Sequence, residues 1–568
     1  MQGEERRRIT SEEYVDFIVD IRVSQAEFLA NFTDPVIQVM NGIDAIVYVP
    51  VGEISFEELG GIRFSAIPNL FGLVSAESLE SSGVFDIREI PAFNLDGEGV
   101  LVGIIDTGID YTNPIFRNDD GSTRIVSIWD QEIDSVDRTP YYYDFGTEYG
   151  REEINEALAS DDPLSIVPSI DENGHGTMLA GIAAGRDAEE DGFYGVAPAS
   201  ELVVVKMRQA KQVWRDFYLI PEDSVCYQSN HIMWGLQYCI QVAWDLNRPI
   251  AICLGIGTSQ TAHDGWSRLD LLGTLVANFS GVALVTAAGN EGNSGRHYYG
   301  NLGPDLDNVS VELNVGADDR GFTMEIWGAS PGIFSVDMLS PGGEYIPRIP
   351  AGLSVSRVIS FIFEETVVYI NYHTVESDTG DQLILLRFEN PTPGLWRFNV
   401  YGRADMPVDF HIWLPMGDFI TNDTFFIRPD IYTTVLSPGS ARNSISVTAY
   451  NPSNDNLYIN SSRGYTRFGN VKPELAAPGV NYVAPNLEQG FEEYTGTSVA
   501  AAHTTGIAAL MLEWGVVQGN YPLMNSNVIK KYLMRGARRT GALSYPNRDW
   551  GYGIIDIFNA FDILRLNI

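Results

Sequence analysis

The chain has 568 residues, of which 45% are hydrophobic, so it can bury more than one apolar core and is too long for one ordinary domain. Its 75 acidic and 36 basic residues give a net charge of -39, which argues against nucleic acid as a partner. No stretch has the roughly 18 uninterrupted apolar residues of a membrane span, so we expect none. The acidic residues are spread along the chain; a solvated surface explains them, and attraction of a basic protein substrate is an alternative.

The N-terminal region differs in texture from the rest. Residues 1–8 carry charges that no apolar segment follows, so we expect no secretory signal and synthesis in the cytoplasm. The pattern predicts a helix from Ser11 to Arg22 and a strand from Ala45 to Val49, before an acidic stretch at 53–58.

Apolar runs and helical stretches alternate in the next part of the chain. The run 99–105 ends at Asp106 and indicates a strand buried on both faces. Further strands are predicted at 202–205, 250–256 and 282–286, with helices at 232–246 and 269–279. This alternation predicts a parallel α/β sheet, in which functional residues gather at the carboxyl ends of the strands.

Three short motifs far apart in the chain carry the residues of a catalytic triad. Asp106 stands in Asp-Thr-Gly, His175 in Gly-His-Gly-Thr and Ser498 in Gly-Thr-Ser. A serine hydroxyl becomes a good nucleophile when a histidine removes its proton, and a buried carboxylate orients that histidine. Each motif alone is more often structural, but together they predict a serine protease. The order Asp, His, Ser excludes the chymotrypsin and α/β-hydrolase orders.

A fourth motif, Ala-Ala-Gly-Asn-Glu-Gly at 287–292, supplies an oxyanion candidate. The carboxamide of Asn290 and the backbone N–H of Ser498 would meet the charge that develops on the attacked carbonyl. Ser498 would open a helix from Val499 to Trp514, which ends at Gly515. Its many small residues suggest a buried central helix.

The stretch from 302 to 430 has a different pattern, with short alternating runs between turns. This spacing predicts a β-sandwich or jelly roll. The α/β pattern resumes with a strand at 445–449, and an insertion whose two ends rejoin one core is compatible with domain anatomy. The stretch could clamp substrate or brace the core and the propeptide, and we favour bracing because it offers no convergent polar cluster.

With these motifs in this order, the chain resembles the subtilisin-like serine proteases, the subtilases of family S8. The flanking sequence 106–114, the signal-free N-terminus and the insertion before Ser498 more narrowly resemble the Csp germination proteases of clostridial spores, CspB among them. The resemblance implies a propeptide at 1–77, a catalytic domain in two parts at 78–301 and 431–568, and an inserted jelly roll at 302–430.

The resemblance also implies what the propeptide does. It would act as an intramolecular chaperone, be cut by the enzyme itself and remain bound in the cleft. The segment 67–80 would lie there as an extended strand, and we predict scission between Glu77 and Ser78. The alternative is an N-terminal extension that is never cut.

Substrate contacts follow from the same resemblance. Gly255, Ile256 and Gly257 match the subtilase segment that pairs with the substrate backbone, although Gly255 replaces the usual Ser. Main-chain pairing would survive this replacement. An ordinary strand end is the alternative, and the side-chain preference of the site cannot be predicted because the insertion splits the pocket wall.

We expect neither a cofactor nor a bound metal. The loop 187–195 has the length of the subtilase calcium loop and many oxygen donors, but Ile115 stands where calcium-binding relatives carry an Asp. Cys226, Cys239 and Cys253 lack metal-like spacing, and we expect them to be buried, reduced thiols.

The family resemblance implies a serine endopeptidase that activates a protein substrate, such as the zymogen of a spore-cortex hydrolase, and that is associated with the spore. Family members that have lost triad residues act in germinant signalling and are candidate partners. The alternatives are an intracellular or exported protease of broad specificity, and a scaffold that keeps the triad without using it.

Overall fold

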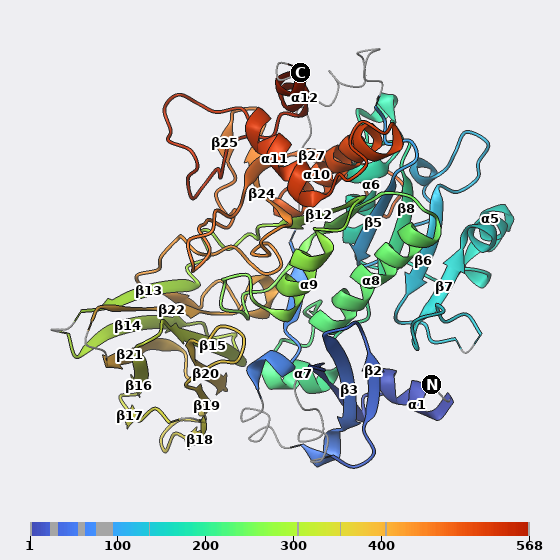
Figure 1. Ribbon diagram of the computed structural model, residues 1–568. Coiled ribbons are helices and arrows are strands. Elements are labelled where there is room, and N and C mark those ends of the chain that lie inside the picture. The colour runs from blue at the N-terminus through green and yellow to red at the C-terminus, as the bar shows by residue number, and fades with distance from the viewer. Residues whose placement is uncertain are drawn as a thin grey trace.

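The computed structural model describes residues 3–22, 32–54, 63–74, 95–135, 137–303, 306–352, 354–403 and 406–565. Figure 1 shows a central α/β unit, with the N-terminal strands at its lower end and a group of β-strands at its side. The predicted α/β class is therefore confirmed.

The central unit is built on a nine-stranded sheet whose inner strands are parallel. All residues of the three middle strands are buried, because helices cover both faces, and this is why these strands read as continuous apolar runs. The spatial order is β25 (Asn456–Leu457), β24 (Ile445–Asn451), β12 (Val282–Ala287), β10 (Ile250–Leu254), β5 (Leu101–Asp106), β8 (Glu201–Lys206), β6 (Ile125–Asp130) and β7 (Thr147–Gly150), with β26 (Leu475–Pro478) beside β24.

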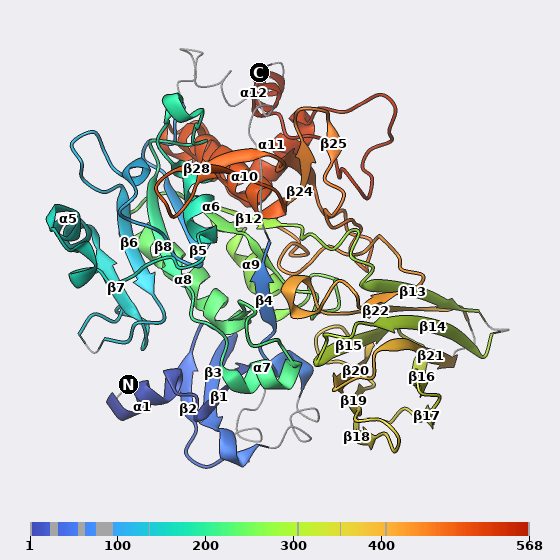
Figure 2. The same cartoon turned by 180° about the vertical axis from the view of Figure 1, so that it is seen from behind.

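Two apolar cores lie on the two faces of this sheet, each under its own helices (Figures 1 and 2). On one face pack α8 (Ser229–Asp245) and α9 (Arg268–Val276), near the positions predicted. On the other face pack α5 (Arg151–Ala159), α6 (His175–Ala184), α10 (Thr497–Leu512), α11 (Ser526–Gly536) and α12 (Ile557–Arg565).

The helix α10 is the central helix of the second core. All 16 of its residues are buried, and it continues into a π-helical turn, Glu513–Val517. By length and composition the stretch 497–517 could cross a membrane, but 89% of its most apolar window is buried inside the protein. It is therefore best described as the core helix of a globular unit. Its small residues allow the helix to approach the strands closely.

Two antiparallel sheets face each other around a shared apolar core and form a β-sandwich. Its first strand begins at His297, so the predicted boundary at 301/302 falls at the end of this strand. One sheet contains β13 (His297–Leu302), β22 (Val408–Trp413), β15 (Gly321–Gly328), β20 (Gln382–Glu389), β19 (Val367–His373) and β18 (Ser354–Ser360); the other contains β17 (Tyr345–Ile349), β16 (Ile333–Leu339), β21 (Gly394–Arg403), β14 (Asn308–Val315) and β23 (Phe425–Phe426).

The six-stranded sheet of the sandwich is covered on both faces. Along β15, Met324 and Ile326 belong to the sandwich core, whereas Trp327 belongs to a cluster shared with α7 (Gln212–Tyr218) of the central unit. Successive side chains of a strand point to opposite faces of the sheet. Because both faces of this sheet are covered, every residue of β15 is buried. The sandwich is thus attached to the central unit through part of a sheet face.

The N-terminal segment contains α1 (Gly3–Thr10) and an antiparallel sheet ordered β1 (Tyr14–Asp20), β3 (Asp44–Pro50), β2 (Val36–Val39). The predicted strand at 45–49 is confirmed by β3. The helix predicted over 11–22 is wrong, because β1 pairs with β3 along its whole length. Its aromatic and β-branched residues favour a strand once a partner strand is available.

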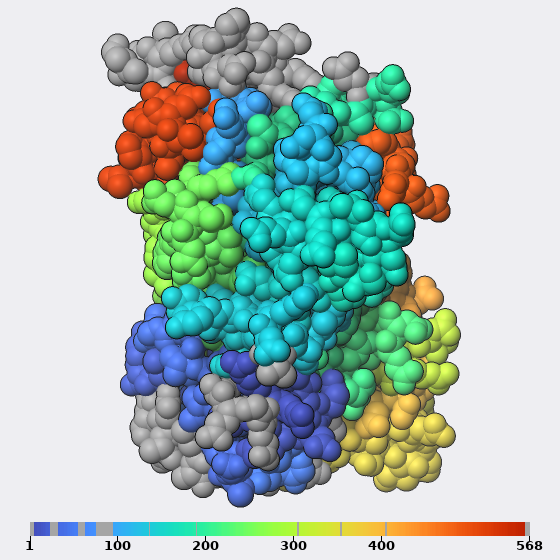
Figure 3. Space-filling model, turned by 90° about the vertical axis from the view of Figure 1, so that its right-hand side faces the viewer, coloured from blue at the N-terminus to red at the C-terminus, as the bar shows by residue number. Residues whose placement is uncertain are grey.

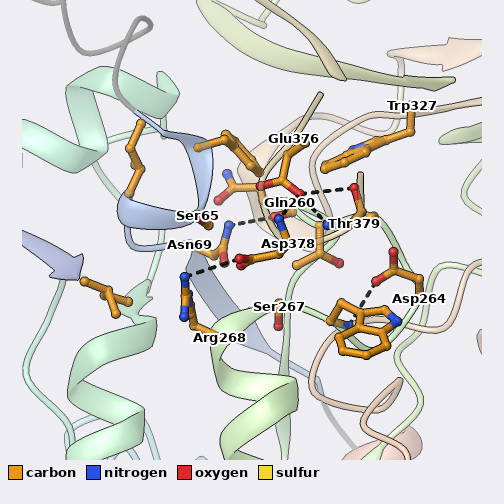
Figure 4. A pocket seen from close by; sticks show the side chains of 16 residues that line it. Ser65, Asn69, Gln260, Asp264, Ser267, Arg268, Trp327, Glu376, Asp378 and Thr379 are labelled. Carbon is orange, nitrogen blue, oxygen red and sulfur yellow. Dashed lines mark hydrogen bonds and ion pairs between the residues drawn. The ribbon is translucent and has the colours of Figure 1, made fainter. Parts of the chain in front are cut away.

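The guanidinium of Arg268 joins the three parts of the chain. It lies 3.5 Å from Asp20 and 3.4 Å from Asp44 of the N-terminal sheet, and 3.2 Å from Asp378 of the sandwich. Figure 4 shows Arg268 and Asp378 pointing toward one another in a pocket that all three parts line. Figure 3 shows the surface of the molecule from one side, where the blue N-terminal residues lie near the yellow residues of the sandwich.

The buried carboxyl of Glu325 on β15 generates a pH-dependent prediction. Its Oε2 accepts a hydrogen bond from Trp327 Nε1 at 2.9 Å, and burial raises its pKa from 4.5 to about 8. The folded protein therefore binds this proton more tightly than the unfolded chain does, so the stability it contributes is full below pH 4.5 and is lost as the pH rises through 8.

We expect Glu325→Gln, which keeps a neutral group, to unfold at nearly the wild-type temperature at pH 4.5 and at an increasingly higher temperature than wild type between pH 6 and pH 9. The exposed Glu365 is the control, and Glu365→Gln should follow the wild type at every pH. A Glu325→Gln difference that stays constant with pH would contradict the burial argument.

Candidate active site

Asp106 and His175 form the first contact of the site. Asp106 is the last residue of β5 and is fully buried, and His175 is the first residue of α6. Oδ1 of Asp106 and Nδ1 of His175 lie 2.7 Å apart. Burial alone would lower the pKa of His175, but the charge and hydrogen bond of Asp106, together with the Val74 carbonyl and the charge of Asp171, more than offset this effect, and the pKa is raised. The carboxylate thus stabilises the imidazolium that a general base becomes.

Ser498 lies in the first turn of α10 and contacts the other nitrogen of His175. Its Oγ is 3.2 Å from Nε2 of His175. The N-terminus of a helix favours negative charge nearby, because its first N–H groups and its dipole point there. The structure therefore brings Asp106, His175 and Ser498 from three distant segments into one hydrogen-bonded row.

Asn290 is held beside this row by Thr497, a residue that the sequence reasoning missed. The N–H and the hydroxyl of Thr497 both lie 3.2 Å from Oδ1 of Asn290 and donate to it. The Thr497 hydroxyl also accepts the N–H of Gly289 at 3.0 Å. With its oxygen held in this way, the amide of Asn290 has its NH₂ group as the end that can donate to a substrate oxygen.

Asp171 fixes the start of the helix that carries His175. Its Oδ1 accepts the N–H of Gly174 at 2.8 Å, and its Oδ2 accepts the N–H and hydroxyl of Thr177. These bonds satisfy donors that the first turn of a helix leaves unpaired. The signal was present in the sequence as an acidic residue four positions before His175, directly ahead of a helical pattern.

Gly255 abuts the triad. A Cβ placed on it would lie 3.2 Å from Cε1 of His175 and 3.2 Å from Cβ of Ser498. It would also come within 2.6 Å of Cδ1 of Leu179, so a side chain here would require Leu179 to move. The glycine thus fits the close approach of this strand end to His175.

The next two residues form β11, Ile256–Gly257, which is one edge of a three-stranded sheet. The middle strand is β4, Leu70–Leu73, from the N-terminal segment, and it pairs antiparallel with β11 so that Gly72 lies opposite Gly257. The other edge is β9, Tyr227–Gln228. Figure 2 shows β4 rising from the N-terminal sheet into the middle of the molecule.

The chain after β4 reaches the triad itself. The carbonyl oxygen of Val74 lies 3.1 Å from Nε2 of His175, and Val74 is buried. The predicted scission residues Glu77 and Ser78 lie outside the described residues. The N-terminal segment therefore occupies the cleft beside His175 with an extended backbone.

An arginine lies beside Ile115, the residue that stands where calcium-binding relatives carry an Asp. The guanidinium of Arg124 donates to the carbonyls of Ile115, Ala184, Pro198 and Ser200 at 2.7 to 2.8 Å. Within the described part of the chain, no group of three His, Cys, Asp or Glu side chains is placed to hold a metal ion. The three cysteines are buried free thiols.

Comparisons with known proteins agree with this geometry. The model of the subtilase family of peptidases S8 matches residues 97–311 and 421–553. The interval between the two matches lies within the β-sandwich. The protein belongs to the subtilase family.

Individual relatives differ in their sequence identity to this chain and in how much of their own length it covers. The solved structure of the CspB protease of Clostridium perfringens superposes with a TM-score of 0.73 and 33% identity, over 85% of this chain and 98% of that chain. The subtilisin-like protease SBT1.9 of Arabidopsis thaliana is 25% identical over 490 residues, and the PI-type proteinase of Lactococcus lactis subsp. cremoris is 21% identical over 588. These matches cover 78% and 93% of this chain but only 60% and 29% of the two relatives.

The position of Asn290 predicts the effect of removing its amide. We expect Asn290→Ala to lower the turnover of a peptide bond roughly a hundredfold or more, about 3 kcal/mol of lost transition-state stabilisation, because one oxyanion donor is missing. The matched control is Asn293→Ala, an exposed neighbour that should keep wild-type turnover. Equal rates for the two variants would remove Asn290 from the oxyanion site.

Proposed function

We propose that this protein is a serine endopeptidase whose first substrate is its own N-terminal segment. The observation that carries the proposal is the row of contacts from Asp106 through His175 to Ser498, at 2.7 and 3.2 Å, with a peptide strand seated beside it. The family and the similarity to a protease of 33% identity support it.

In the proposed reaction His175 takes the proton of Ser498, and the Ser498 oxygen attacks the carbonyl carbon of the substrate. The amide of Asn290 and the backbone N–H of Ser498 donate to the resulting oxyanion, while Asp106 stabilises the imidazolium. The imidazolium then gives its proton to the departing amine. Water hydrolyses the remaining ester and releases a carboxylate.

We also propose that the cleaved segment stays in place. It supplies β4, which is hydrogen-bonded on both edges, and its β1 carries the fully buried Asp16. Asp16 accepts from Trp214, Gln228 and Asn230 at 2.6 to 3.2 Å and lies 3.5 Å from Nζ of Lys211. Departure of the segment would leave the buried Lys211 without this carboxylate, which is costly.

The natural role is proposed by similarity. The similarity to the CspB protease supports limited proteolysis of a protein substrate. We propose that the enzyme activates a spore-cortex hydrolase zymogen during germination and is associated with the spore. Pseudoprotease members of the Csp family are the partners that this role suggests. Broad cleavage of unfolded proteins, or a scaffold with an unused triad, are the competing functions.

The first test compares intact masses of the wild type and Ser498→Ala, before and after a fluorophosphonate probe. We expect two fragments in the wild type only. Cut protein that takes up no probe would mean that the segment still blocks the cleft. Uncut, unlabelled wild type would support the scaffold.

Retention of the segment has its own test. We expect Lys211→Met to release the cleaved N-terminal fragment at a lower urea concentration than wild type, because Asp16 is left buried without its cation. The control is Lys531→Met, a change at an exposed lysine of α11. Co-elution of the fragment from size-exclusion chromatography measures release. Indistinguishable urea profiles for the two variants would contradict the role of this ion pair.

A further inference from the structure

The register of β4 identifies which of its peptide bonds faces the nucleophile. Its backbone runs antiparallel to β11, and the next residue, Val74, places its carbonyl oxygen 3.1 Å from Nε2 of His175. The same nitrogen lies 3.2 Å from Oγ of Ser498. Attack requires the carbonyl carbon to lie near the Ser498 oxygen, and among the described residues of the N-terminal segment Val74 has the carbonyl that contacts His175, the partner of Ser498.

The side chains of this strand alternate between two apolar clusters. Leu70 and Val74 belong to one cluster, together with Leu436. Phe71 belongs to the other cluster, and Leu73 packs against it. This is the two-residue period of an extended strand, so Val74 points toward the side of the cleft that contains Leu436.

Leu436 fills the space between two glycines of the cleft walls. A Cβ on Gly257 of β11 would lie 2.7 Å from Cδ1 of Leu436, and a Cβ on Gly289, just before Asn290, would lie 2.5 Å from Cγ of Leu436. Both distances are shorter than real contacts, so the side chain of Leu436 is already packed against both walls. Little room is therefore left between these two glycines for a substrate side chain.

The backbone around Leu436 is held to the same two walls. Its N–H donates to the carbonyl of Ala288 at 2.9 Å, and the N–H of Ser437 donates to the carbonyl of Thr258 at 3.1 Å. Leu436 is also fully buried. Residues that directly follow β12 and β11 thus fix the backbone of Leu436, and its side chain limits the length of a side chain that enters beside it.

A second limit lies two residues earlier in β4. A Cβ on Gly72 would be 3.4 Å from Cε of Met416 and 3.4 Å from Cζ of Phe419. One methyl group fits at ordinary contact distance, but a longer side chain would meet both residues. The cleft therefore favours a small residue at this position.

We propose that this site cleaves after a short aliphatic residue that follows a small residue two positions earlier, that Leu436 sets this limit, and that the bond following Val74 is the one cut in the chain itself. The inference rests on the proposed endopeptidase function. The Ser498 oxygen bonds to the carbonyl carbon of Val74, the C–N bond to residue 75 breaks, and His175 protonates the released amine. Water then frees Val74 as a carboxylate.

This assignment differs from scission between Glu77 and Ser78, so peptide mapping separates the two. We expect the N-terminal fragment of the wild type to end at Val74 and the large fragment to begin at Ser75, with Ser498→Ala uncut. Scission at any other bond overturns this inference but leaves the proposed function standing. A wild type that stays uncut overturns both.

The size limit is tested by enlarging the side chain at position 74 and reducing the one at position 436. We expect Val74→Phe to slow processing at least a hundredfold and Val74→Ala to be cut, because Phe cannot enter beside Leu436. The double variant Val74→Phe with Leu436→Gly should recover cutting after residue 74. Thermal melting establishes that the variants with Leu436→Gly are folded.

Two outcomes overturn the size limit: Val74→Phe cut at the wild-type rate, or a folded double variant that stays as slow as Val74→Phe alone. If Leu436→Gly prevents folding, the comparison of Val74→Ala with Val74→Phe decides, since equal rates for these two would exclude a limit on side-chain length. Gly72→Ala and Gly72→Leu provide the matched pair for the second limit, with the leucine variant expected to be the slower.

Discussion

Parallel pairing of β5, β10 and β12 is the constraint on which the site depends. Because these strands pair in the same direction, their carboxyl ends emerge at one edge of the sheet. That edge receives Asp106, Gly255 and Asn290, of which the first and last are 184 positions apart in the chain. The helices α6 and α10 begin at the same edge and bring His175 and Ser498. Chemistry that needs sub-ångström placement is thus assembled from buried elements.

The sequence was sufficient where local pattern and packing agree. β5 was predictable because a strand covered on both faces must be apolar throughout, and the triad was predictable because its motifs differ from ordinary turns. The stretch 11–22 was misread, since the strand conformation of β1 is stabilised by β3, which lies more than twenty residues further on. Over so short a run, the spacing of its apolar residues does not distinguish the period of a helix from the period of a strand.

Thr497 and Leu436 were missed for another reason. Each acts on a residue that is distant in sequence: Thr497 on Asn290, and Leu436 on the walls at Gly257 and Gly289. No spacing rule connects such positions, and the insertion separates Leu436 from both walls. The contact between the sandwich and the central unit was also not predicted, because nothing within β15 indicates that Trp327 meets a helix of another unit.

Arg124 gives the fold a property that a bound ion would not. Its guanidinium binds four carbonyls from three separate segments, as a metal ion could, but it is part of the polymer. A tethered cation has no dissociation equilibrium, so chelators and changes in dissolved salts cannot deplete it. Once the chain has folded, this corner of the molecule needs no component from the surrounding solution.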